Sequence, residues 1–238
     1  MTDIHSHILF GIDDGSNDIE ESILLLKRMA AAGFNHVILT PHYIEGSDYS
    51  VENPEKDKRF AMLKEAIKEN NLNIEIHLGN EIFIHNHLLS SIENNKCYGL
   101  NKGKYLLIEL PFHNQILNLE DIIYEIKIQG YTPVIAHPER YSYFQNDYSL
   151  VDALKEEDVL FQCNYSSILG YYHKESEKLI KYMLKKRYVD YLGTDIHHTN
   201  KAFVLDNFNK IIKHIKKITG NEYFEKIMNN CNDLVNDK

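Results

Sequence analysis

Histidine and acidic residues occur in this sequence at spacings that could hold metal ions. His5 and His7 stand two positions apart near the N-terminus, and Asp195 and His197 repeat that spacing near the C-terminus. Side chains at i and i+2 on an extended segment point the same way, so each pair could grip an ion from two sides. Imidazole nitrogen and carboxylate oxygen without thiolate suit Zn²⁺, Mn²⁺ or Fe, and the histidines argue against a site for Mg²⁺ or Ca²⁺ alone.

Four more residues of these types come at the ends of short apolar runs: His42, Glu81, Glu109 and His137. Glu109 is the most unusual, because it lies inside the run Tyr105–Leu110 and an ionised carboxylate is rarely buried without a cation. A structural salt bridge is the alternative for Glu109 taken alone. With the two pairs, the set comprises five imidazoles and three carboxylates. One ion does not accept that many ligands, so we expect two or three ions.

The elements that position these residues follow from the apolar pattern. Seven short runs recur about 25 to 40 residues apart, the repeat of a strand with its crossover helix. These runs are the one around Ile4, His36–Thr40, Ile74–Leu78, Tyr105–Leu110, Thr132–Ala136, Val159–Cys163 and Val189–Gly193. Amphipathic segments between them predict helices over Ile19–Ala32, Glu55–Asn70, Leu119–Gln129, Lys174–Arg187 and Ala202–Ile218. The alternation indicates a parallel sheet buried on both faces.

Two architectures contain such a sheet, an open doubly wound sheet and a barrel. The segment after the first strand reads HILFGIDDG, which is neither a dinucleotide-binding fingerprint nor a phosphate-binding loop. No linker or change of composition divides the chain, so we expect a single barrel-like domain over residues 1–238. In both architectures the active site forms at the carboxyl ends of the strands, where the residues above are placed.

Composition narrows the class of protein. The 238 residues include 26 Lys and Arg against 35 Asp and Glu, a net charge of −9, which argues against a nucleic-acid partner. No apolar run approaches the roughly 20 residues of a membrane-spanning helix, and the N-terminus lacks the pattern of a cleaved signal. We therefore expect a cytoplasmic protein without stable membrane insertion.

The three cysteines exclude one route to hydrolysis. Cys97, Cys163 and Cys231 form no C-x-x-C pair and are odd in number, which favours a reducing compartment. No arginine stands six positions after any of them, so the C-x₅-R motif of cysteine phosphatases is absent. No G-x-S-x-G motif occurs either, which disfavours a serine hydrolase.

In this order the motifs resemble those of the PHP (polymerase and histidinol phosphatase) superfamily of metal-dependent phosphoesterases. The resemblance is strongest to the bacterial capsule and exopolysaccharide tyrosine phosphatases of the CpsB/CapC/YwqE type. It is carried by DIHSHILFGIDDGS at 3–16, TPH at 40–42, GNEIF at 79–83, AHPERY at 136–141 and QCNYSSILG at 162–170. It implies a distorted (β/α)₇ TIM-like barrel with two or three metal ions, Mn²⁺ by expectation and Fe or Zn²⁺ as alternatives.

The resemblance also implies a set of ligands for each ion. His5, His7, Glu81 and Asp195 would hold the first, and Glu81, Glu109 and His137 the second. His42 and His197 would hold the third with an acid from the loop after the first strand. Asp14 is the expected acid, and Asp13 is the alternative. The remaining histidines receive no chemical role: His36, His77, His85, His87, His113, His173, His198 and His214.

The implied activity is removal of phosphate from the tyrosine-rich tail of a bacterial tyrosine kinase that controls polysaccharide export. Metal ions would activate a water to hydroxide and clamp the phosphoryl oxygens. His137 and Arg140 would be catalytic, with Arg140 also positioning the phosphate. Lys201 stands where the family often has a further arginine, and lysine contacts phosphate only as a point charge. The alternatives are a small-molecule phosphatase, such as one acting on histidinol phosphate, and a metal-bound interaction module without catalysis.

Overall fold

The computed structural model describes residues 1–236, and its strands form two parallel sheets. The first sheet has the order β1-β2-β4 and the second has the order β3-β5-β6-β7-β8-β9. Every strand pair is parallel. The bounds are β1 Thr2–Asp3, β2 His36–Leu39, β3 His42–Tyr43, β4 Glu75–Leu78, β5 Glu81–Phe83, β6 Tyr105–Glu109, β7 Thr132–Ala136, β8 Leu160–Asn164 and β9 Tyr191–Gly193.

Each of the seven predicted strand positions holds a strand, and two of these strands are followed at once by a second short strand that was not predicted. The chain passes from β2 to β3 through Thr40 and Pro41, and from β4 to β5 through Gly79 and Asn80. Proline has no N–H to donate, so it interrupts the ladder where the chain changes sheet. His42 is the first residue of β3 and Glu81 is the first residue of β5. The two residues lie opposite each other in the parallel pairing of these strands.

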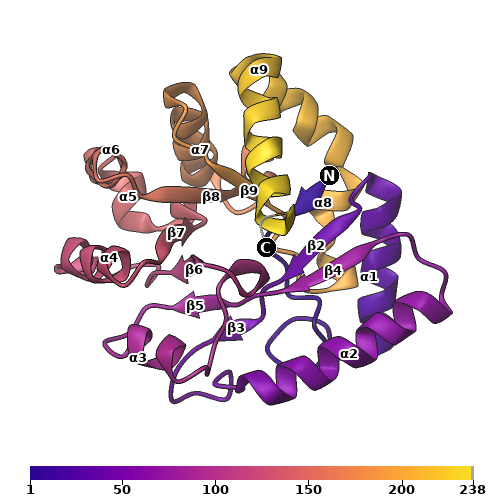
Figure 1. Ribbon diagram of the computed structural model, residues 1–238. Helices are drawn as coiled ribbons and strands as arrows, with labels where there is room; N and C mark the ends of the chain where they lie inside the picture. Colours follow the sequence, from indigo (N-terminus) through magenta and orange to yellow (C-terminus); the bar gives the residue numbers. More distant parts are fainter. Residues whose placement is uncertain (237–238) are drawn as a thin grey trace.

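The first and last strands of the chain meet, so the sheet curls. Beyond β1 and β9, Ser6 and Ile196 form a parallel bridge, and the backbone N–H of Asp195 donates to the carbonyl of His5 at 2.9 Å. The buried Asp3 carboxylate accepts hydrogen bonds from the backbone N–H and the hydroxyl of Thr194, at 2.8 and 2.6 Å. Figure 1 accordingly shows the strands gathered around the middle of the molecule.

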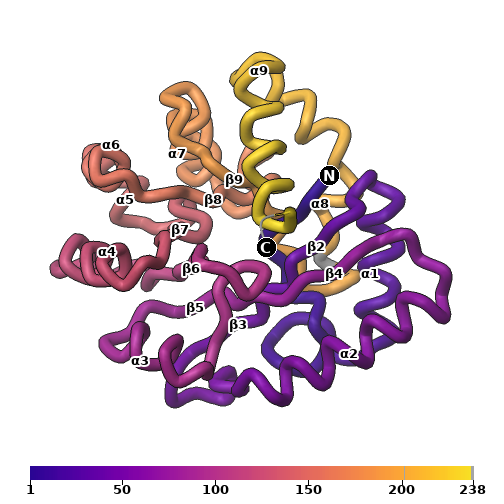
Figure 2. The backbone as a smooth tube through the Cα atoms, viewed as in Figure 1, coloured from indigo at the N-terminus to yellow at the C-terminus, as the bar shows by residue number. Residues whose placement is uncertain are grey.

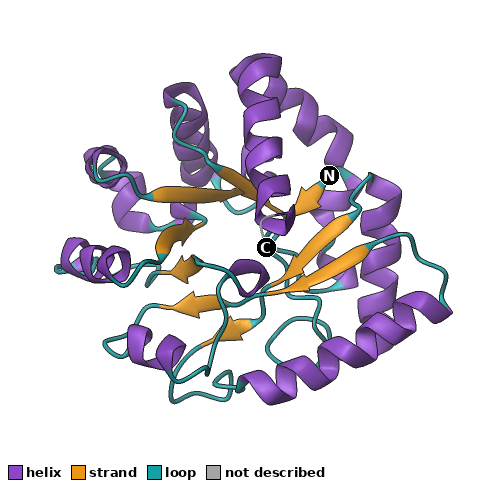
Figure 3. Cartoon of the chain, viewed as in Figure 1, coloured by secondary structure: helices purple, strands orange, loops and turns teal. Residues whose placement is uncertain are grey.

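Helices surround these strands on the outside, as the purple ribbons of Figure 3 show. Their bounds are α1 Ile19–Ala32, α2 Asn53–Glu69, α3 Leu88–Glu93, α4 Leu119–Ile128, α5 Ser142–Asn146, α6 Ser149–Glu156, α7 Lys174–Lys186, α8 Phe203–Asp206 and α9 Phe208–Asn236. The described residues also include four short 3₁₀ helices: η1 Leu100–Lys102, η2 Pro138–Arg140, η3 Tyr165–Leu169 and η4 Thr199–Lys201. The trace in Figure 2 shows α9 returning from the rim toward the middle.

Local sequence explains where the helices start and stop. Asp18 caps α1 by accepting a hydrogen bond from the N–H of Glu21 at 2.8 Å, and Gly33 ends it with φ of +99°. The predicted helix Ala202–Ile218 is wrong as a single element. The chain leaves helical geometry at Asn207, which separates α8 from α9, and α9 then runs to Asn236 with a kink at Gly220, where φ is +73°.

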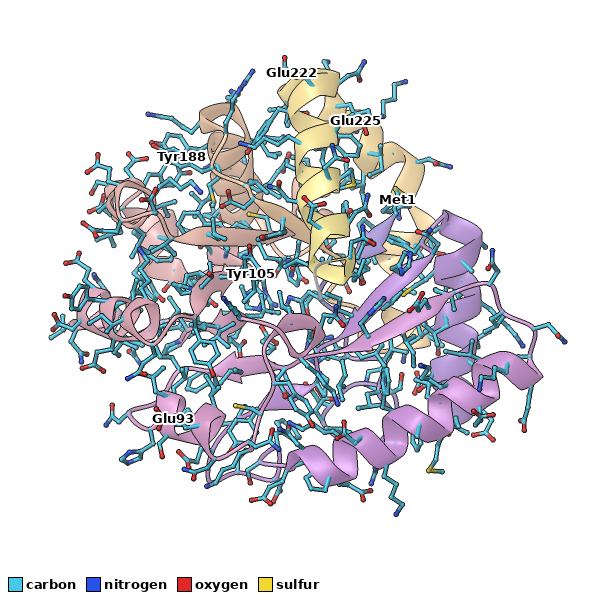
Figure 4. All side chains as sticks on the ribbon, viewed as in Figure 1. Met1, Glu93, Tyr105, Tyr188, Glu222 and Glu225 are labelled. Carbon is cyan, nitrogen blue, oxygen red and sulfur yellow. The ribbon has the colours of Figure 1, made fainter. Side chains whose placement is uncertain are left out.

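Side chains fill the space between strands and helices (Figure 4). Glu222 and Glu225 stand out on α9 at the edge of this view, whereas Tyr105 lies near its middle. The three cysteines are buried and unpaired, as the sequence indicates for a chain without disulfides. Among the described residues, no helix is both long enough and apolar enough to cross a membrane.

Candidate metal centre

The two predicted pairs lie together at the carboxyl ends of the strands. His5 and His7 follow β1, and their Nε2 atoms are 3.2 Å apart. Asp195 follows β9, and its Oδ1 is 3.6 Å from the Nε2 of each histidine. Glu81, the first residue of β5, brings its Oε2 to 3.3 Å from both nitrogens. Two imidazoles and two carboxylates thus converge on one point.

Glu81 connects this point to a second group of ligands. Its Oε2 lies 3.1 Å from His42 Nδ1, and its Oε1 lies 2.8 Å from His137 Nε2. Glu109, at the end of β6, faces the same two histidines at 3.7 and 3.9 Å. One carboxylate therefore contacts four imidazoles, an arrangement suited to an acid that bridges two ions.

The loop after β1 supplies two acids with different surroundings. Asp13 is buried, and its Oδ2 is 2.7 Å from His7 Nδ1 while also accepting from the N–H of His42 at 2.8 Å. Asp14 is half exposed, and its Oδ1 lies 3.7 Å from His42 Nε2 and 3.6 Å from His197 Nε2. Asp14 is thus the acid that faces the two histidines of the expected third ion. Asp13 instead orients His7 by a hydrogen bond to Nδ1, the ring nitrogen that does not face Glu81.

Two of these residues have an unusual backbone conformation. His137 has φ of +33° and Asp195 has φ of +52°, both in the left-handed region that favours glycine. Such conformations cost of order 1–3 kcal/mol each and persist where the surrounding structure holds them. The fold therefore imposes the direction of both side chains.

The carboxylates and imidazoles change one another's protonation. Burial and neighbouring carboxylates raise the pKa of Glu109 to about 9. Burial opposes ionisation of Glu81 too, but the surrounding histidines hold its pKa well below the usual value. Burial and nearby cations lower the pKa of His137 and of His197 to about 4, so both imidazoles keep a free lone pair at neutral pH.

The donor set fits divalent cations. Glu81, Asp195 and Asp13 have buried side chains and a low pKa, and the Arg140 guanidinium contacts this group through Asp195. Buried carboxylates are costly unless cations neutralise them. Burial opposes protonation of His5 and His7, but these acids raise the pKa of both, so their surroundings favour positive charge. Three sets of ligand atoms each lie within 4.8 Å of one another: His5, His7, Glu81; His42, Glu81, Glu109; and His7, Asp14, His42, His197. All nine predicted metal ligands therefore lie in one cluster.

Several residues that support the cluster were not predicted. Gln162, in β8, holds His5 through a 2.8 Å contact between its Oε1 and the imidazole Nδ1. The Gln162 amide donates in turn to Asn164 Oδ1 at 2.9 Å, which fixes its orientation. Hydrogen bonds of this kind set the tautomer and the direction of a metal-binding histidine. The available signal was the alternation of polar Gln162 and Asn164 within an apolar strand.

Arg140 lies at the rim of the cluster, between two aromatic rings. Its guanidinium is 4.8 Å from the ring centre of Phe112 and 4.3 Å from that of Tyr172. Its Nη1 donates to Asp195 Oδ2 at 2.8 Å, and the same oxygen accepts from Asn164 Nδ2 at 2.7 Å. Burial opposes ionisation, but Asp195 raises the pKa of Arg140 above its ordinary value, so the charge is permanent.

A cavity of about 460 Å³ opens beside the cluster. Its lining includes Asp14, Arg140, Tyr171, Tyr172, Asp195 and His197. Tyr171 is partly exposed and stacks on Phe203 with ring centres 4.7 Å apart. The cavity thus combines carboxylate and imidazole ligands, one fixed cation and aromatic surface. Lys201 belongs to η4, and its side chain lies outside the described part of the structure, so its predicted role stays a prediction.

Comparison with known families covers the residues described above. A model of the family described as capsular polysaccharide synthesis, CpsB/CapC, matches residues 1–236. The chain belongs to this CpsB/CapC family. The resemblance predicted from the ordered motifs is confirmed.

Relatives of this CpsB/CapC member carry consistent descriptions. The putative tyrosine-protein phosphatase CapC of Staphylococcus aureus is 32% identical over 206 residues, which cover 86% of this chain and 80% of that protein. The tyrosine-protein phosphatase YwqE of Bacillus subtilis (strain 168) is 30% identical over 216 residues, covering 87% and 84%.

Solved structures support the same placement. One from the work on YwqE of Bacillus subtilis and CpsB of Streptococcus pneumoniae, described as unique metal-dependent tyrosine phosphatases, matches with a TM-score of 0.93 at 26% identity. That match covers 100% of this chain and 95% of the other. A putative 2-pyrone-4,6-dicarboxylic acid hydrolase of Pseudomonas putida, at 11% identity and a TM-score of 0.53, shares the fold alone.

Proposed function

We propose that this protein is a metal-dependent protein-tyrosine phosphatase that hydrolyses phosphotyrosine. The observation that carries the proposal is the position of Glu81, whose carboxylate faces four imidazoles beside a cavity that contains Arg140. Membership of the CpsB/CapC family and the descriptions of its relatives support the same activity.

The ligands divide among two or three ions, with Mn²⁺ as the expected metal and Fe or Zn²⁺ as alternatives. His5, His7 and Asp195 would hold the first with Glu81, which would be shared with the second. The second would add Glu109 and His137. His42, His197 and Asp14 would hold the third, because the oxygens of Asp13 are already engaged by His7, His42 and the N–H of Gly15. When bound, such ions lower the pKa of a coordinated water and neutralise phosphoryl oxygens.

Arg140 is the residue that we assign to the phosphate. Its guanidinium offers donors in a planar fork that matches phosphate oxygens. Asp195 and the two aromatic rings fix its direction before a substrate arrives, so little reorganisation is needed as charge develops. His137 acts beside it as a neutral ligand that presents Nε2 to the cluster. Lys201 is proposed as a weaker second cation for the same group.

The aromatic lining of the cavity favours a phosphotyrosine over a small aliphatic phosphate. Tyr171 lines the cavity together with Arg140 and Asp14 and is backed by its stack on Phe203, so the ring of a phosphotyrosine would pack against Tyr171 once its phosphate reaches the cluster. Offset or edge-on contacts between aromatic rings contribute about 0.5–1.5 kcal/mol beyond the area they bury.

We further infer that the two sheets form one distorted (β/α)₇ barrel in a single domain over residues 1–238. The seven strand positions, the parallel pairing and the meeting of the segments after β1 and β9 support this architecture. The substrate that fits a CpsB/CapC member is the phosphotyrosine tail of a bacterial tyrosine kinase in capsule or exopolysaccharide synthesis, encountered in the cytoplasm. A nucleic-acid partner is not part of this proposal, since the net charge is −9.

The test compares initial rates on a phosphotyrosine peptide and on histidinol phosphate, using metal-stripped protein with and without added Mn²⁺. We expect Mn²⁺ to restore hydrolysis of the peptide and to leave histidinol phosphate nearly untouched. Restored activity on histidinol phosphate alone would contradict the substrate but keep the metal centre. Absence of turnover on both, with stable binding of the phosphorylated tail, would replace the enzyme by an interaction module.

A further inference from the structure

A second group of metal-binding side chains lies at the opposite ends of the strands from the site above. His36 and Glu75 are the first residues of β2 and β4 and are paired in register, and His77 follows on β4. One ligand atom from each residue lies within 4.8 Å of the other two. His36 Nδ1 is 3.2 Å from His77 Nε2 and 3.8 Å from Glu75 Oε2. The sequence pattern predicts no chemical role for His36 or His77.

The surroundings of His77 leave the nitrogen that faces His36 with a free lone pair. Asn101 brings its Oδ1 to 3.2 Å from His77 Nδ1, and its own Nδ2 donates to the carbonyl of Leu234 at 3.0 Å. The amide is thereby fixed with its oxygen toward the ring, so His77 carries its proton on Nδ1 and presents Nε2 unprotonated. Metal-binding histidines are commonly oriented by a partner of this kind.

The distances suit a tetrahedral ion. Nitrogen ligands lie at about 2.0–2.1 Å from zinc, so two of them at the tetrahedral angle stand about 3.3 Å apart. The nitrogens of His36 and His77 are already at 3.2 Å. The carboxylate of Glu75 is mostly exposed and needs only a small rotation to approach. Solvent would complete the coordination, since the His36 side chain is also partly exposed.

We propose that His36, Glu75 and His77 form a binding site for a divalent transition-metal ion of the zinc class, distinct from the catalytic cluster. The ion joins the starts of β2 and β4 and, through Asn101, the last turns of α9. This inference does not depend on the proposed phosphatase activity, because none of its residues belongs to the catalytic cluster.

The experiment counts all metal ions per chain. Full-length protein is dialysed against Mn²⁺ and then against Mn²⁺ with a fixed free concentration of Zn²⁺, and total metal is measured by mass spectrometry. Counting both metals makes exchange within the catalytic cluster irrelevant. We expect His36→Ala and His36→Gln to hold one ion fewer than the wild type, with Mn²⁺-dependent hydrolysis of a phosphotyrosine peptide unchanged. His214→Ala, a substitution of the same type outside both clusters, should match the wild type.

Asn101 provides a second, sharper comparison. Asn101→Gly removes the acceptor that orients His77 and suits the positive φ of +53° at this position, and it should weaken zinc binding at this site by about tenfold. Asn101→Asp retains the acceptor and should keep the affinity. Equal metal counts in the wild type and both His36 variants would overturn the proposal and leave the contact between the two imidazoles as an ordinary hydrogen bond.

Discussion

The two histidine clusters of this protein lie at opposite ends of the same strands and differ in charge. At the carboxyl ends, buried Glu81, Glu109 and Asp195 stand among five imidazoles. At the amino ends, the single carboxylate of Glu75 stands beside two partly exposed imidazoles. The first cluster thus gathers several buried carboxylates in one place, whereas the second has one carboxylate that is mostly exposed.

From this difference we expect ions at the first cluster to take part in catalysis and an ion at the second cluster only to join strands β2 and β4. Bridged ions in a buried, acid-rich site can share ligands and leave positions for a substrate. A single ion held by two histidines and one exposed acid would contribute stability by joining the strands that carry them. The cavity and Arg140 occur at the carboxyl ends.

Removal of metal should have the largest effect on activity, because the proposed catalytic ions lie at the carboxyl ends of the strands. Chelation followed by gel filtration should reduce hydrolysis of a phosphotyrosine peptide by about a thousandfold or more, equivalent to roughly 4 kcal/mol of lost transition-state stabilisation. Added Mn²⁺ should restore the rate, and His137→Ala should not be rescued by it. Full activity of His137→Ala in purified protein would contradict the catalytic assignment. Under the same reconstitution His36→Ala should behave as the wild type.

Substitutions of Arg140 test whether its positive charge contributes to catalysis. Arg140→Met keeps the apolar stem between Phe112 and Tyr172 but removes the charge, and kcat/KM for the peptide should fall by about a hundredfold. Arg140→Lys should recover only part of the loss, because lysine lacks the planar fork. Steady-state kinetics on one peptide measures both variants. Equal kcat/KM for Arg140→Met and the wild type would remove Arg140 from the phosphate site.

Substitution of Gln162 tests the role of a residue that orients a proposed metal ligand, His5, without itself binding the metal. Gln162→Leu removes the acceptor for His5 Nδ1 at similar volume, and metal affinity at the catalytic cluster should fall by about 10- to 100-fold. Activity at saturating Mn²⁺ should recover most of the wild-type rate, so the effect appears as a shift of the Mn²⁺ activation curve. Gln129→Leu, at the end of α4, is the matched control. An unshifted curve would show that His5 needs no support.

Lys56 contrasts with the buried acids of the first cluster, because it is a buried cation with no ion pair among the described residues. Its Nζ donates to Asn80 Oδ1 at 2.7 Å and to the carbonyl of Lys96 at 3.2 Å. Burial lowers the pKa of Lys56 to about 8, from an ordinary value of 10.5. Between these values the unfolded chain holds a proton that the folded chain has released, so stability rises with pH.

We therefore expect the free energy of unfolding to gain about 1 kcal/mol between pH 8 and pH 9 from this group alone. Urea denaturation of the wild type and of Lys56→Met at both pH values isolates the effect, because the other titrating groups are common to both proteins. The same pH dependence in Lys56→Met and in the wild type would show that Lys56 keeps its charge when buried.

Sequence pattern predicted the strand positions and the residues that gather at the carboxyl ends of the strands, because both depend on local contrast. A glutamate such as Glu109 inside an apolar run, or a histidine directly after one, is visible without knowledge of the fold. The boundary between α8 and α9 was not visible, because the segment around Asn207 keeps its apolar periodicity while the backbone departs from the helix.

Contacts between distant side chains set the limit of that prediction. His36 and His77 are 41 residues apart, and their pairing depends on the register of β2 with β4. Gln162 supports His5 across 157 residues, through an amide whose orientation is set by Asn164. The alternation of Gln162 and Asn164 marks that strand as unusual, but no spacing in the sequence predicts that Gln162 meets His5 or that His36 meets His77.

The closure of β1 against β9 has a consequence for the order in which the protein is made. Asp3 and Thr194, which join the two strands, are separated by 191 residues of chain. During translation His5 and His7 leave the ribosome first, and Asp195 and His197 follow only when most of the polypeptide has been synthesised. A nascent chain therefore carries three of the four residues proposed for the first ion, His5, His7 and Glu81, long before Asp195 is made, and the proposed site can be completed only with the last strand.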